Sequence, residues 1–355
     1  MVPASQPSVA VTIVTYNSEH YIGRCLPYVL AQDLPALKVV VVDNASTDRT
    51  RYILEAFRER ITVIRNEVNA GFARAQNQAI RAARCDWTLT LNPDVRLTPG
   101  FLRTLVAEGE HHPQVGTVCG KLLSFADDFA IPSAPQRFDS TGIYMTPNLR
   151  HFDRGSGSID DRRFSMREYV FGATGAAALY RRTMIDAISW NGEFFDDDFF
   201  AYREDADVAW RAQLMGWSCL YTPEAVAFHV RNVLPTNRRS SAPAINMHSV
   251  KNRFLLRIKN VTPDLYRRHG LAMTARDLLV IAGCLLYEWR SLKAFKLVLS
   301  SLRRTLQKRR DLMSRRTASD SYIAQWFASE PASFPAQSSV IQSTTSSMGD
   351  RTGTA

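Results

Sequence analysis

The residues most able to do chemistry in this sequence are Asn92, Pro93 and Asp94, which follow an apolar run from Trp87 to Leu91. Proline has no amide hydrogen to donate, so a strand over this run should stop pairing there. The residue before proline favours extended geometry, and we expect Asn92 and Asp94 to point outward at the carboxyl end of the strand. A carboxylate beside an amide carbonyl suits a hard cation that carries a diphosphate. All three residues are also common in turns, so this stretch alone leaves a simple turn as an equal alternative.

The elements that would position these residues alternate between strands and helices. Apolar, β-branched runs predict buried strands at 9–15, 38–42, 61–64 and 87–91, and helical patterns follow the first three. This alternation is typical of an α/β fold with a doubly wound, mostly parallel, Rossmann-like sheet. No Gly-x-Gly-x-x-Gly follows the first strand, so the dinucleotide-binding fingerprint is absent.

Every one of these predicted strands ends in polar residues. They are Thr15 and Asn17, Asp43 and Asn44, Asn66 and Asn69, and Asn92 and Asp94. Because the carboxyl ends of parallel strands meet at one edge of a sheet, these side chains should converge there. We interpret the converging row as a ligand-binding cleft.

Positive charge is concentrated in the last part of the chain. The net charge of the protein is +10, and residues 290–316 contain ten lysines and arginines against one acid, Asp311. A basic excess in one segment predicts a polyanionic partner, either nucleic acid or an anionic membrane surface. From about Ser329 onward the Ser/Thr/Gly-rich sequence predicts a disordered tail.

The five cysteines are isolated, and no Cys-x-x-Cys is present. Neither a disulfide framework nor a zinc site is indicated, and we expect a reducing compartment. The first seven residues contain neither the basic region nor the apolar run of a secretory signal. The longest apolar stretch, residues 278–287, is about half as long as a membrane-spanning helix.

The middle of the chain is less regular. Residues 124–167 contain several prolines and glycines and predict loops around a hairpin, an insert of the kind that is usually functional or mobile. Small residues dominate 172–178 and would let a backbone or a ligand approach closely. A helix is predicted to begin near Glu204 and to stop at Gly216, with Trp210 on its core-facing side.

With these segments assembled, the chain resembles the GT-A fold, family 2 glycosyltransferases, and among them the rhamnosyl- and galactofuranosyl-type transferases of bacterial surface polysaccharides. The resemblance covers roughly residues 8–260, and several ordered motifs make it specific. The matching motifs are VTIVTYNS at 11–18, VVVDNASTD at 40–48, NAGFARAQNQ at 69–78, LNPD at 91–94, FGATGAAALYRR at 171–182, FFAYREDADVAWRAQLMGW at 199–217 and PEAVAFH at 223–229.

The resemblance implies an inverting, metal-dependent glycosyltransferase. It would move a sugar, with rhamnose as one candidate, from a nucleotide-diphosphate donor to a hydroxyl of a lipid-linked glycan in cell-surface polysaccharide synthesis. Residues 1–260 would form the transferase domain, 261–328 a basic amphipathic helical region, and 329–355 the disordered tail. The enzyme would be cytoplasmic and peripheral, its C-terminal helices lying on the anionic inner face of the plasma membrane. The basic run lacks a reader motif, so nucleic acid is not the expected partner.

The resemblance also assigns residues to the donor. Asp43 would hydrogen-bond the pyrimidine base, and its alternative is a turn or helix-capping carboxylate. The other residues lining the nucleotide would be Thr15, Tyr16, Asn17 and Asn44. Arg74 and Asn77 lie one helical turn apart, and Arg74 would pair with phosphate unless it is simply solvated.

Asp94 matches the metal carboxylate of an Asp-x-Asp motif whose first position is here the neutral Asn92. The resemblance implies that Asp94, the diphosphate and a third group hold Mg²⁺ or Mn²⁺. His229 is the candidate for that group, with a structural histidine as the alternative. Because Asn92 weakens the match, a non-catalytic sugar-nucleotide-binding protein remains the alternative function.

Asp205 matches the general base of the family. Its carboxylate would take the proton of the acceptor hydroxyl as the anomeric carbon is attacked. Glu204, which we expect at the substrate site, and Asp207 are nearby like charges that would raise the pKa of the base. The alternative for Asp205 is a helix cap.

Overall fold

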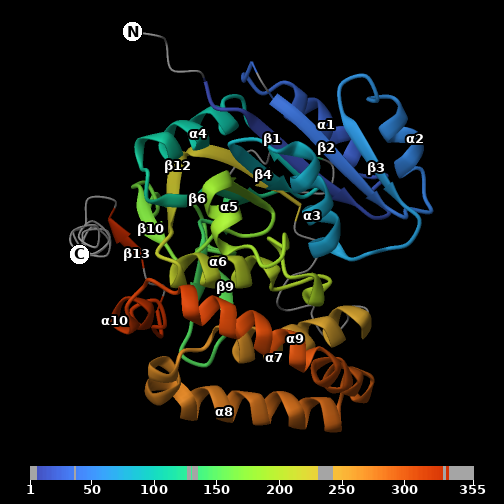
Figure 1. Ribbon diagram of the computed structural model, residues 1–355. Coiled ribbons are helices and arrows are strands. Elements are labelled where there is room, and N and C mark those ends of the chain that lie inside the picture. Colours follow the sequence, from blue (N-terminus) through green and yellow to red (C-terminus); the bar gives the residue numbers. More distant parts are fainter. Residues whose placement is uncertain are drawn as a thin grey trace, which may run out of the picture.

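The computed structural model describes residues 6–35, 37–125, 129, 135–230, 243–330 and 333–335. Its centre is a mixed sheet in the strand order β13-β10-β12-β6-β11-β4-β1-β2-β3 (Figure 1). The strands on this path are β1 (Val9–Thr15), β2 (Leu37–Asn44), β3 (Thr62–Asn66), β4 (Trp87–Leu91), β6 (Val115–Ser124), β10 (Glu168–Val170), β11 (Ala177–Arg181), β12 (Ser218–His229) and β13 (Ser333–Pro335).

The first four strands run parallel, as the alternation of strands and helices predicts. Their side chains point alternately to the two faces of the sheet. On one face Val11 and Ile13 share a buried cluster with α1 (Ile22–Leu30), and on the other Ala10 and Val14 share one with α3 (Phe72–Ala83). A run of apolar residues thus forms a strand buried on both sides, the usual arrangement in a doubly wound sheet.

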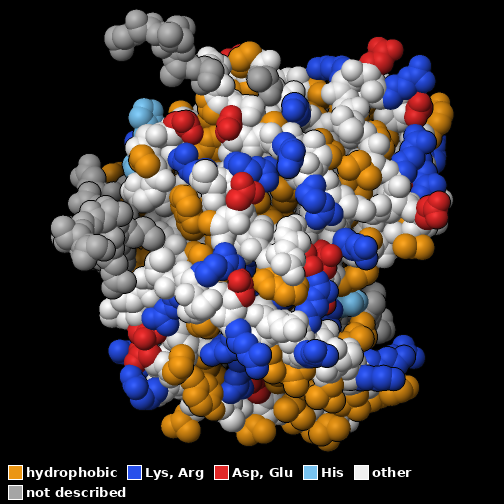
Figure 2. Space-filling view, in the orientation of Figure 1, with side chains coloured by type: hydrophobic (Ala, Val, Ile, Leu, Met, Phe, Trp, Pro, Cys, Tyr) orange, Lys and Arg blue, Asp and Glu red, His pale blue; other side chains and the backbone are white. Residues whose placement is uncertain are grey.

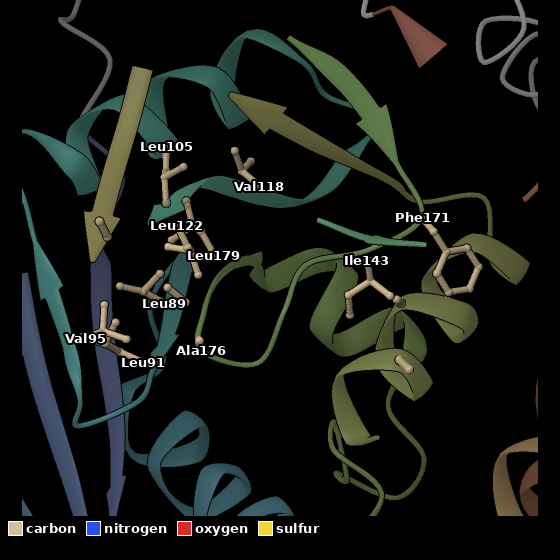
Figure 3. Packing of buried hydrophobic residues seen from close by; sticks show 14 of the residues in the cluster. Leu89, Leu91, Val95, Leu105, Val118, Leu122, Ile143, Phe171, Ala176 and Leu179 are labelled. Carbon is tan, nitrogen blue, oxygen red and sulfur yellow. The ribbon is translucent and has the colours of Figure 1, made fainter. Parts of the chain in front are cut away.

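The sheet changes direction after β4. β11 pairs antiparallel with both β4 and β6, and β6 and β12 run parallel. Leu89 of β4, Leu179 of β11, and Val118 and Leu122 of β6 form the core here, under Leu105 of α4 (Phe101–His111) (Figure 3). The remaining elements of this half are α2 (Thr50–Glu55), β5 (Val95–Leu97), β7 (Arg137–Ser140), β8 (Ile143–Met145), β9 (His151–Asp153), α5 (Arg182–Ile188), the 3-10 turn η1 (Asp197–Phe199) and α6 (Glu204–Leu214).

Helices close the molecule at its C-terminal end. They are α7 (Pro243–Asn260), α8 (Pro263–Leu286), the short η3 (Trp289–Leu292), α9 (Lys293–Arg315) and α10 (Asp320–Ala324). The helical region predicted at 261–328 is not one continuous helix, because the chain leaves helical geometry at Tyr287 and η3 intervenes. α8 is also longer than the apolar stretch at 278–287 indicates, because Pro263 starts it and Thr262 caps it.

The chain returns to the sheet after α9. The ring of Phe327 packs 4.8 Å from that of Trp210 in the buried side of α6. Ser333–Pro335 then pairs antiparallel with β10, although it lies in the stretch predicted to be disordered. Residues 331–332 and 336–355 of that stretch lie outside the described residues, as do 126–128 and 130–134 of the predicted insert.

Candidate active site

The Asn-Pro-Asp stretch lies where β4 ends, as predicted. The last hydrogen bond between this strand and the segment of β11 is donated by the backbone N–H of Asn92 to the carbonyl of Ala176, at 2.9 Å. The chain then turns into β5, which pairs antiparallel with the end of β12 so that Val95 lies opposite His229. This register brings His229 Nε2 to 3.4 Å from Oδ1 of Asp94. Two of the residues predicted to hold a metal therefore face each other.

A third residue, Asp139, completes this arrangement and was not predicted. Its Oδ2 accepts a hydrogen bond from Nδ1 of His229 at 2.8 Å, and Asp139 is fully buried. It lies in β7 where the pairing with β6 is irregular, between Phe138 opposite Leu123 and Ser140 opposite Leu122. Such irregularities commonly re-aim a side chain. Because the surrounding sequence has no regular period, only a search for buried partners of His229 would have found it.

The donor atoms of this pair fit a divalent cation. Asp94 Oδ1 is buried without a well-formed hydrogen bond, and it faces the ring nitrogen of His229. Burial works to lower the pKa of His229, but Asp139 and Asp94 outweigh it and raise the pKa to about 10, so a cation at Nε2 would have to displace a proton. Within the described residues, no group of three or more His, Cys, Asp or Glu side chains is arranged to hold a metal. The protein thus offers one carboxylate and one imidazole, and a cation would need further oxygen ligands.

Asp205 lies in the first turn of α6, beside the end of β4. Its Oδ2 accepts from the N–H of Gly175 at 3.0 Å, and its Oδ1 accepts from the N–H of Ala206 at 2.7 Å. Gly175 precedes Ala176, whose carbonyl holds Asn92. Two consecutive residues therefore tie the predicted base to the predicted metal stretch.

Glu204 and Asp205 both have raised pKa values. Burial is the main cause for each, and the neighbouring Asp205 adds to the shift of Glu204, whose pKa rises to about 8.

Small residues allow α6 to lie this close to the loop before β11. A Cβ on Gly172 would come within 2.2 Å of the Cβ of Ala209, so the predicted close approach of a backbone is present here.

Asp207, the third acid in the first turn of α6, has a different environment. Its carboxylate accepts hydrogen bonds from Lys259 and Asn260 of α7 and from Arg211 of α6. Burial alone would raise its pKa, but Lys259 and Arg211 lower it. Asp207 is therefore occupied by structural ion pairs.

The loop before α6 has an uncommon backbone conformation. Phe200, Tyr202 and Arg203 all have positive φ angles of 64°, 72° and 70°. The side-chain amide of the fully buried Asn252 donates to the carbonyls of Phe199, Ala201 and Tyr202 at 2.7–2.8 Å. Left-handed residues without glycine persist only where the surroundings impose them, and they cluster at functional sites. Asn252, which no motif indicated, supplies that constraint.

The residues predicted to bind the donor lie at the ends of β1 and β2. Asp43 is fully buried; Oδ2 accepts from Arg51 at 2.6 Å, and Oδ1 accepts from the N–H of Ser46. These are the contacts of a turn residue, and its role at the base stays a prediction. Asn17 accepts from the N–H of Thr47 at 2.8 Å. Tyr16 is half-exposed at this edge, whereas Thr15 is buried.

The amide of Asn44 is also in use within the protein, because it donates to Asn69 and accepts from Asn66. Arg74 and Asn77 differ more than their shared helix face suggested. Arg74 is exposed, whereas Asn77 is buried and its amide binds the backbone of Phe195 and the carboxylate of Asp197. These contacts give Asn77 a structural use, and its predicted contact with substrate stays a prediction.

Comparisons with known proteins show the family and the fold of the chain. The family model described as "Glycosyl transferase family 2" matches residues 10–189. The N-acetylglucosaminyl-diphospho-decaprenol L-rhamnosyltransferase of Mycobacterium tuberculosis is 27% identical over 235 residues, which is 62% of this chain and 75% of that protein. The putative glycosyltransferase EpsH of Bacillus subtilis is 24% identical over 206 residues, which is 56% of this chain and 55% of that protein.

Solved structures share the fold. GalNAc-T7 with UDP, GalNAc and Mn²⁺ matches with a TM-score of 0.58 at 12% identity, over 76% of this chain and 52% of that one. The mannosyltransferase PcManGT from Pyrobaculum calidifontis, in complex with GDP-Man and Mn²⁺, has a TM-score of 0.51 at 19% identity, over 90% and 86% of the two chains. The sheet with its flanking helices is therefore a GT-A type fold.

Proposed function

Because the chain belongs to glycosyl transferase family 2, we propose that it is an inverting enzyme that moves a sugar from a nucleotide-diphosphate donor to a hydroxyl of a lipid-linked glycan. Rhamnose is the first sugar to test, since the similar mycobacterial protein is a rhamnosyltransferase whose name gives a diphospho-decaprenol acceptor. The product would enter cell-surface polysaccharide synthesis. The enzyme would work on the cytoplasmic side of the membrane, in keeping with five buried, free cysteines.

Asp205 acts as the general base in this proposal. A sugar hydroxyl is a poor nucleophile, and the carboxylate takes its proton while the oxygen forms a bond to the anomeric carbon. The bond from that carbon to the diphosphate breaks on the opposite side, so one displacement inverts the configuration. The N–H groups of Gly175 and Ala206 hold the carboxylate in place. Its raised pKa makes it a stronger base than an exposed aspartate.

Asp94 and His229 would hold Mg²⁺ or Mn²⁺ together with oxygens of the donor. The cation supplies charge stabilisation for the departing diphosphate. Asp139 would keep the imidazole of His229 oriented so that Nε2 faces Asp94, since a carboxylate on the other ring nitrogen fixes both the tautomer and the ring. The neutral side chain of Asn92 leaves one negative charge fewer than a second aspartate would.

The donor nucleotide would lie along the ends of β1 and β2. Its proposed contacts are Thr15, Tyr16, Asn17, Asp43 and Asn44, with the exposed Arg74 near the phosphates and Glu204 near the sugar. α3 begins beside these strand ends, because the N–H of Ala70, two residues before the helix, donates to the side chain of Asn44. A helix N-terminus favours a negatively charged group.

The observation that carries the proposal is the connection of Asp205 and Asn92 through Gly175 and Ala176. The test is a thermal-shift screen of nucleotide sugars with Mn²⁺ or Mg²⁺, because a donor that binds the folded state raises the unfolding temperature. The best donor is then incubated with a lipid-linked acceptor, and the anomeric configuration of the product is read by NMR. Retention of configuration would refute an inverting mechanism.

Asn92 also favours one other candidate, a sugar-nucleotide-binding protein without turnover. Such a protein would show a thermal shift with a donor but neither transfer nor slow donor hydrolysis. In an enzyme, the Asp205→Asn variant would keep the thermal shift and lose the turnover.

A further inference from the structure

α8 presents a large apolar surface to the outside of the molecule. Leu271 is 91% exposed, and Leu279 and Leu286 are 64% and 71% exposed. Figure 2 shows hydrophobic side chains gathered along the edge of the molecule that α8 forms in Figure 1. Contiguous exposed apolar surface of this kind marks a binding surface. The large exposed hydrophobic residues from α8 through η3 are Tyr266, Leu271, Leu278, Leu279, Leu285, Leu286, Tyr287, Trp289 and Leu292.

The helix has two distinct sides. The exposed leucines recur at seven-residue spacing, about two helical turns, and so share one side, whereas the buried Met273, Asp277 and Cys284 lie on the opposite side. By length and composition α8 could cross a membrane, but only 17% of its most apolar window is buried inside the protein. The core helix of a soluble protein would be mostly buried, so the outward side of α8 has no cover within the described residues.

A buried ion pair fixes the inward side of α8. Oδ1 of Asp277 accepts from Nε of Arg253 at 2.7 Å, and Arg257 pairs with the same carboxylate. Both arginines belong to α7. The same helix contains Asn252, which donates hydrogen bonds to the loop before Asp205. A membrane crossing by α8 would place Asp277 in hydrocarbon or tear it from its partners, and either is costly. This ion pair favours a helix that lies flat.

The charge around α8 is complementary to anionic lipid. Arg267 and Arg268 are exposed in its first turns, although both pair with Asp264. Arg290, Lys293 and Lys296 are exposed just after its end. Tyr287 and Trp289, which are 83% and 69% exposed, have the amphipathic rings that prefer the boundary between lipid and water.

α9, the helix with most of the basic residues, contributes less free charge than its sequence suggests. Lys308 is buried among Glu193, Asp196 and Asp198, and Arg304 pairs with two of the same acids. These cations hold α9 against the transferase domain. The apolar side of α8, and not the charge of α9, is therefore the main feature of this end of the molecule.

We propose that the outward side of α8, with Tyr287 and Trp289, inserts into the surface of an anionic lipid bilayer while the helix lies parallel to the membrane plane. This deepens the proposed function, on which its purpose rests, because a lipid-linked acceptor has its reacting sugar at the same surface. Binding of such helices grows with the apolar area inserted and with the attraction of basic residues to anionic lipid.

The test measures sedimentation of the purified full chain with vesicles of phosphatidylcholine and phosphatidylglycerol. The wild-type chain should bind, and alkaline carbonate should release it. The double variant Leu278→Gln/Leu279→Gln should bind at least about tenfold more weakly, because two large apolar side chains are lost from the inserted area. The matched control is Tyr52→Gln/Met166→Gln, which changes two equally exposed apolar residues elsewhere and should bind like the wild type.

Three results would overturn the proposal. The first is equal binding by the leucine variant with an unchanged unfolding temperature, and the second is wild-type protein that resists carbonate, as a crossing helix would. The third is absence of vesicle binding together with a dimer in sedimentation velocity that the leucine variant loses, because the surface would then be an interface between two copies. Failure of the proposed function can be told apart from failure of this proposal. A chain that binds vesicles but transfers no sugar would support the membrane surface and contradict the proposed function. A chain that glycosylates a soluble acceptor but does not bind vesicles would support the proposed function and contradict the membrane surface.

Discussion

Two sets of buried carboxylates lie around the start of α6, and their surroundings shift their pKa values in opposite directions. The first set is Asp205, whose Oδ2 accepts from the N–H of Gly175, and its neighbour Glu204, and burial raises both pKa values. Asp196 and Asp207 form the second set. Burial works against their ionisation too, but nearby cations together outweigh it and lower both pKa values: Lys259 and Lys308 act on Asp196, and Lys259 and Arg211 act on Asp207.

The difference lies in the partners and not in the depth of burial. In the part of the chain that the structure describes, Glu204 and Asp205 form no ion pair with lysine or arginine, whereas Lys259 contacts both Asp196 and Asp207. The cations behind α6 come from α7 and α9. The C-terminal helices thus supply cations to Asp196 and Asp207, whereas Glu204 and Asp205 keep raised pKa values.

The strongest way to break this comparison is the variant Asp205→Asn. An amide cannot take the acceptor proton, so kcat should fall by about 10²–10⁴-fold. The donor-induced thermal shift and the free energy of unfolding should stay near the wild-type values. Steady-state kinetics with the screened donor measure the first quantity, and Asp186→Asn, an exposed carboxylate on α5, is the control. Wild-type turnover in Asp205→Asn would move the base to another residue.

The variant Asp207→Asn should produce the opposite pattern. It leaves Lys259 and Arg211 with one charged partner fewer in a buried site, and breaking a buried pair costs about 3 kcal/mol. Urea denaturation followed by circular dichroism measures the lost free energy of unfolding, while kcat of the folded protein should change little. A stable but inactive Asp207→Asn protein would give Asp207 a catalytic role. The two sets of carboxylates would then no longer differ in function.

Much of the sheet and part of the site could be predicted from the sequence. The valine-rich runs form β1 and β2 because such residues suit strands buried on both faces. Asp94 and His229 meet as predicted, through the pairing of β5 with β12. These features depend on the local pattern of apolar residues and on the rule that the carboxyl ends of parallel strands meet at one edge of a sheet. Both can be applied to a single sequence.

The remaining features depend on contacts between distant parts of the chain. Asp139 is aimed by an irregular pairing in a stretch without periodicity, and Asn252 matters only because three nearby residues adopt left-handed geometry. Lys308 is also one of the basic residues from which a polyanionic partner was predicted. Its acidic partners lie more than 100 positions earlier in the chain. Composition alone could therefore not reveal that Lys308 forms ion pairs inside the protein.

Asp139 sharpens the comparison as a third kind of buried carboxylate, one paired with a histidine. In Asp139→Asn the imidazole of His229 loses its charged partner, and we expect Mn²⁺ affinity to fall about 10–100-fold. Electron paramagnetic resonance of free Mn²⁺, titrated with protein and nucleoside diphosphate, measures this without turnover. Asp160→Asn, which removes a carboxylate paired with Lys121, is the control. An unchanged affinity would reduce Asp139 to a packing role.

The finest distinction between the two sets is the sign of their contribution to stability as pH changes. The pKa of Glu204 is about 8 in the folded protein, above the ordinary value of 4.5, so the folded state holds a proton that the unfolded state releases. Its contribution to stability is therefore present below pH 4.5 and is lost as the pH rises toward 8. Asp207 has the opposite sign. Its lowered pKa stabilises the folded state above its ordinary value of 3.8, and this is lost as the pH falls through the folded-state pKa.

Glu204→Gln tests this sign directly, because glutamine keeps the shape and cannot ionise. Relative to the wild type, the variant should gain on the order of 1 kcal/mol in free energy of unfolding between pH 5 and pH 8. Urea titrations at the two pH values measure the difference, and Glu59→Gln, an exposed glutamate, serves as the matched control. A variant that instead loses stability relative to the wild type on going to pH 8 would mean that Glu204 is ionised and paired, and Glu204 would then resemble Asp196 and Asp207.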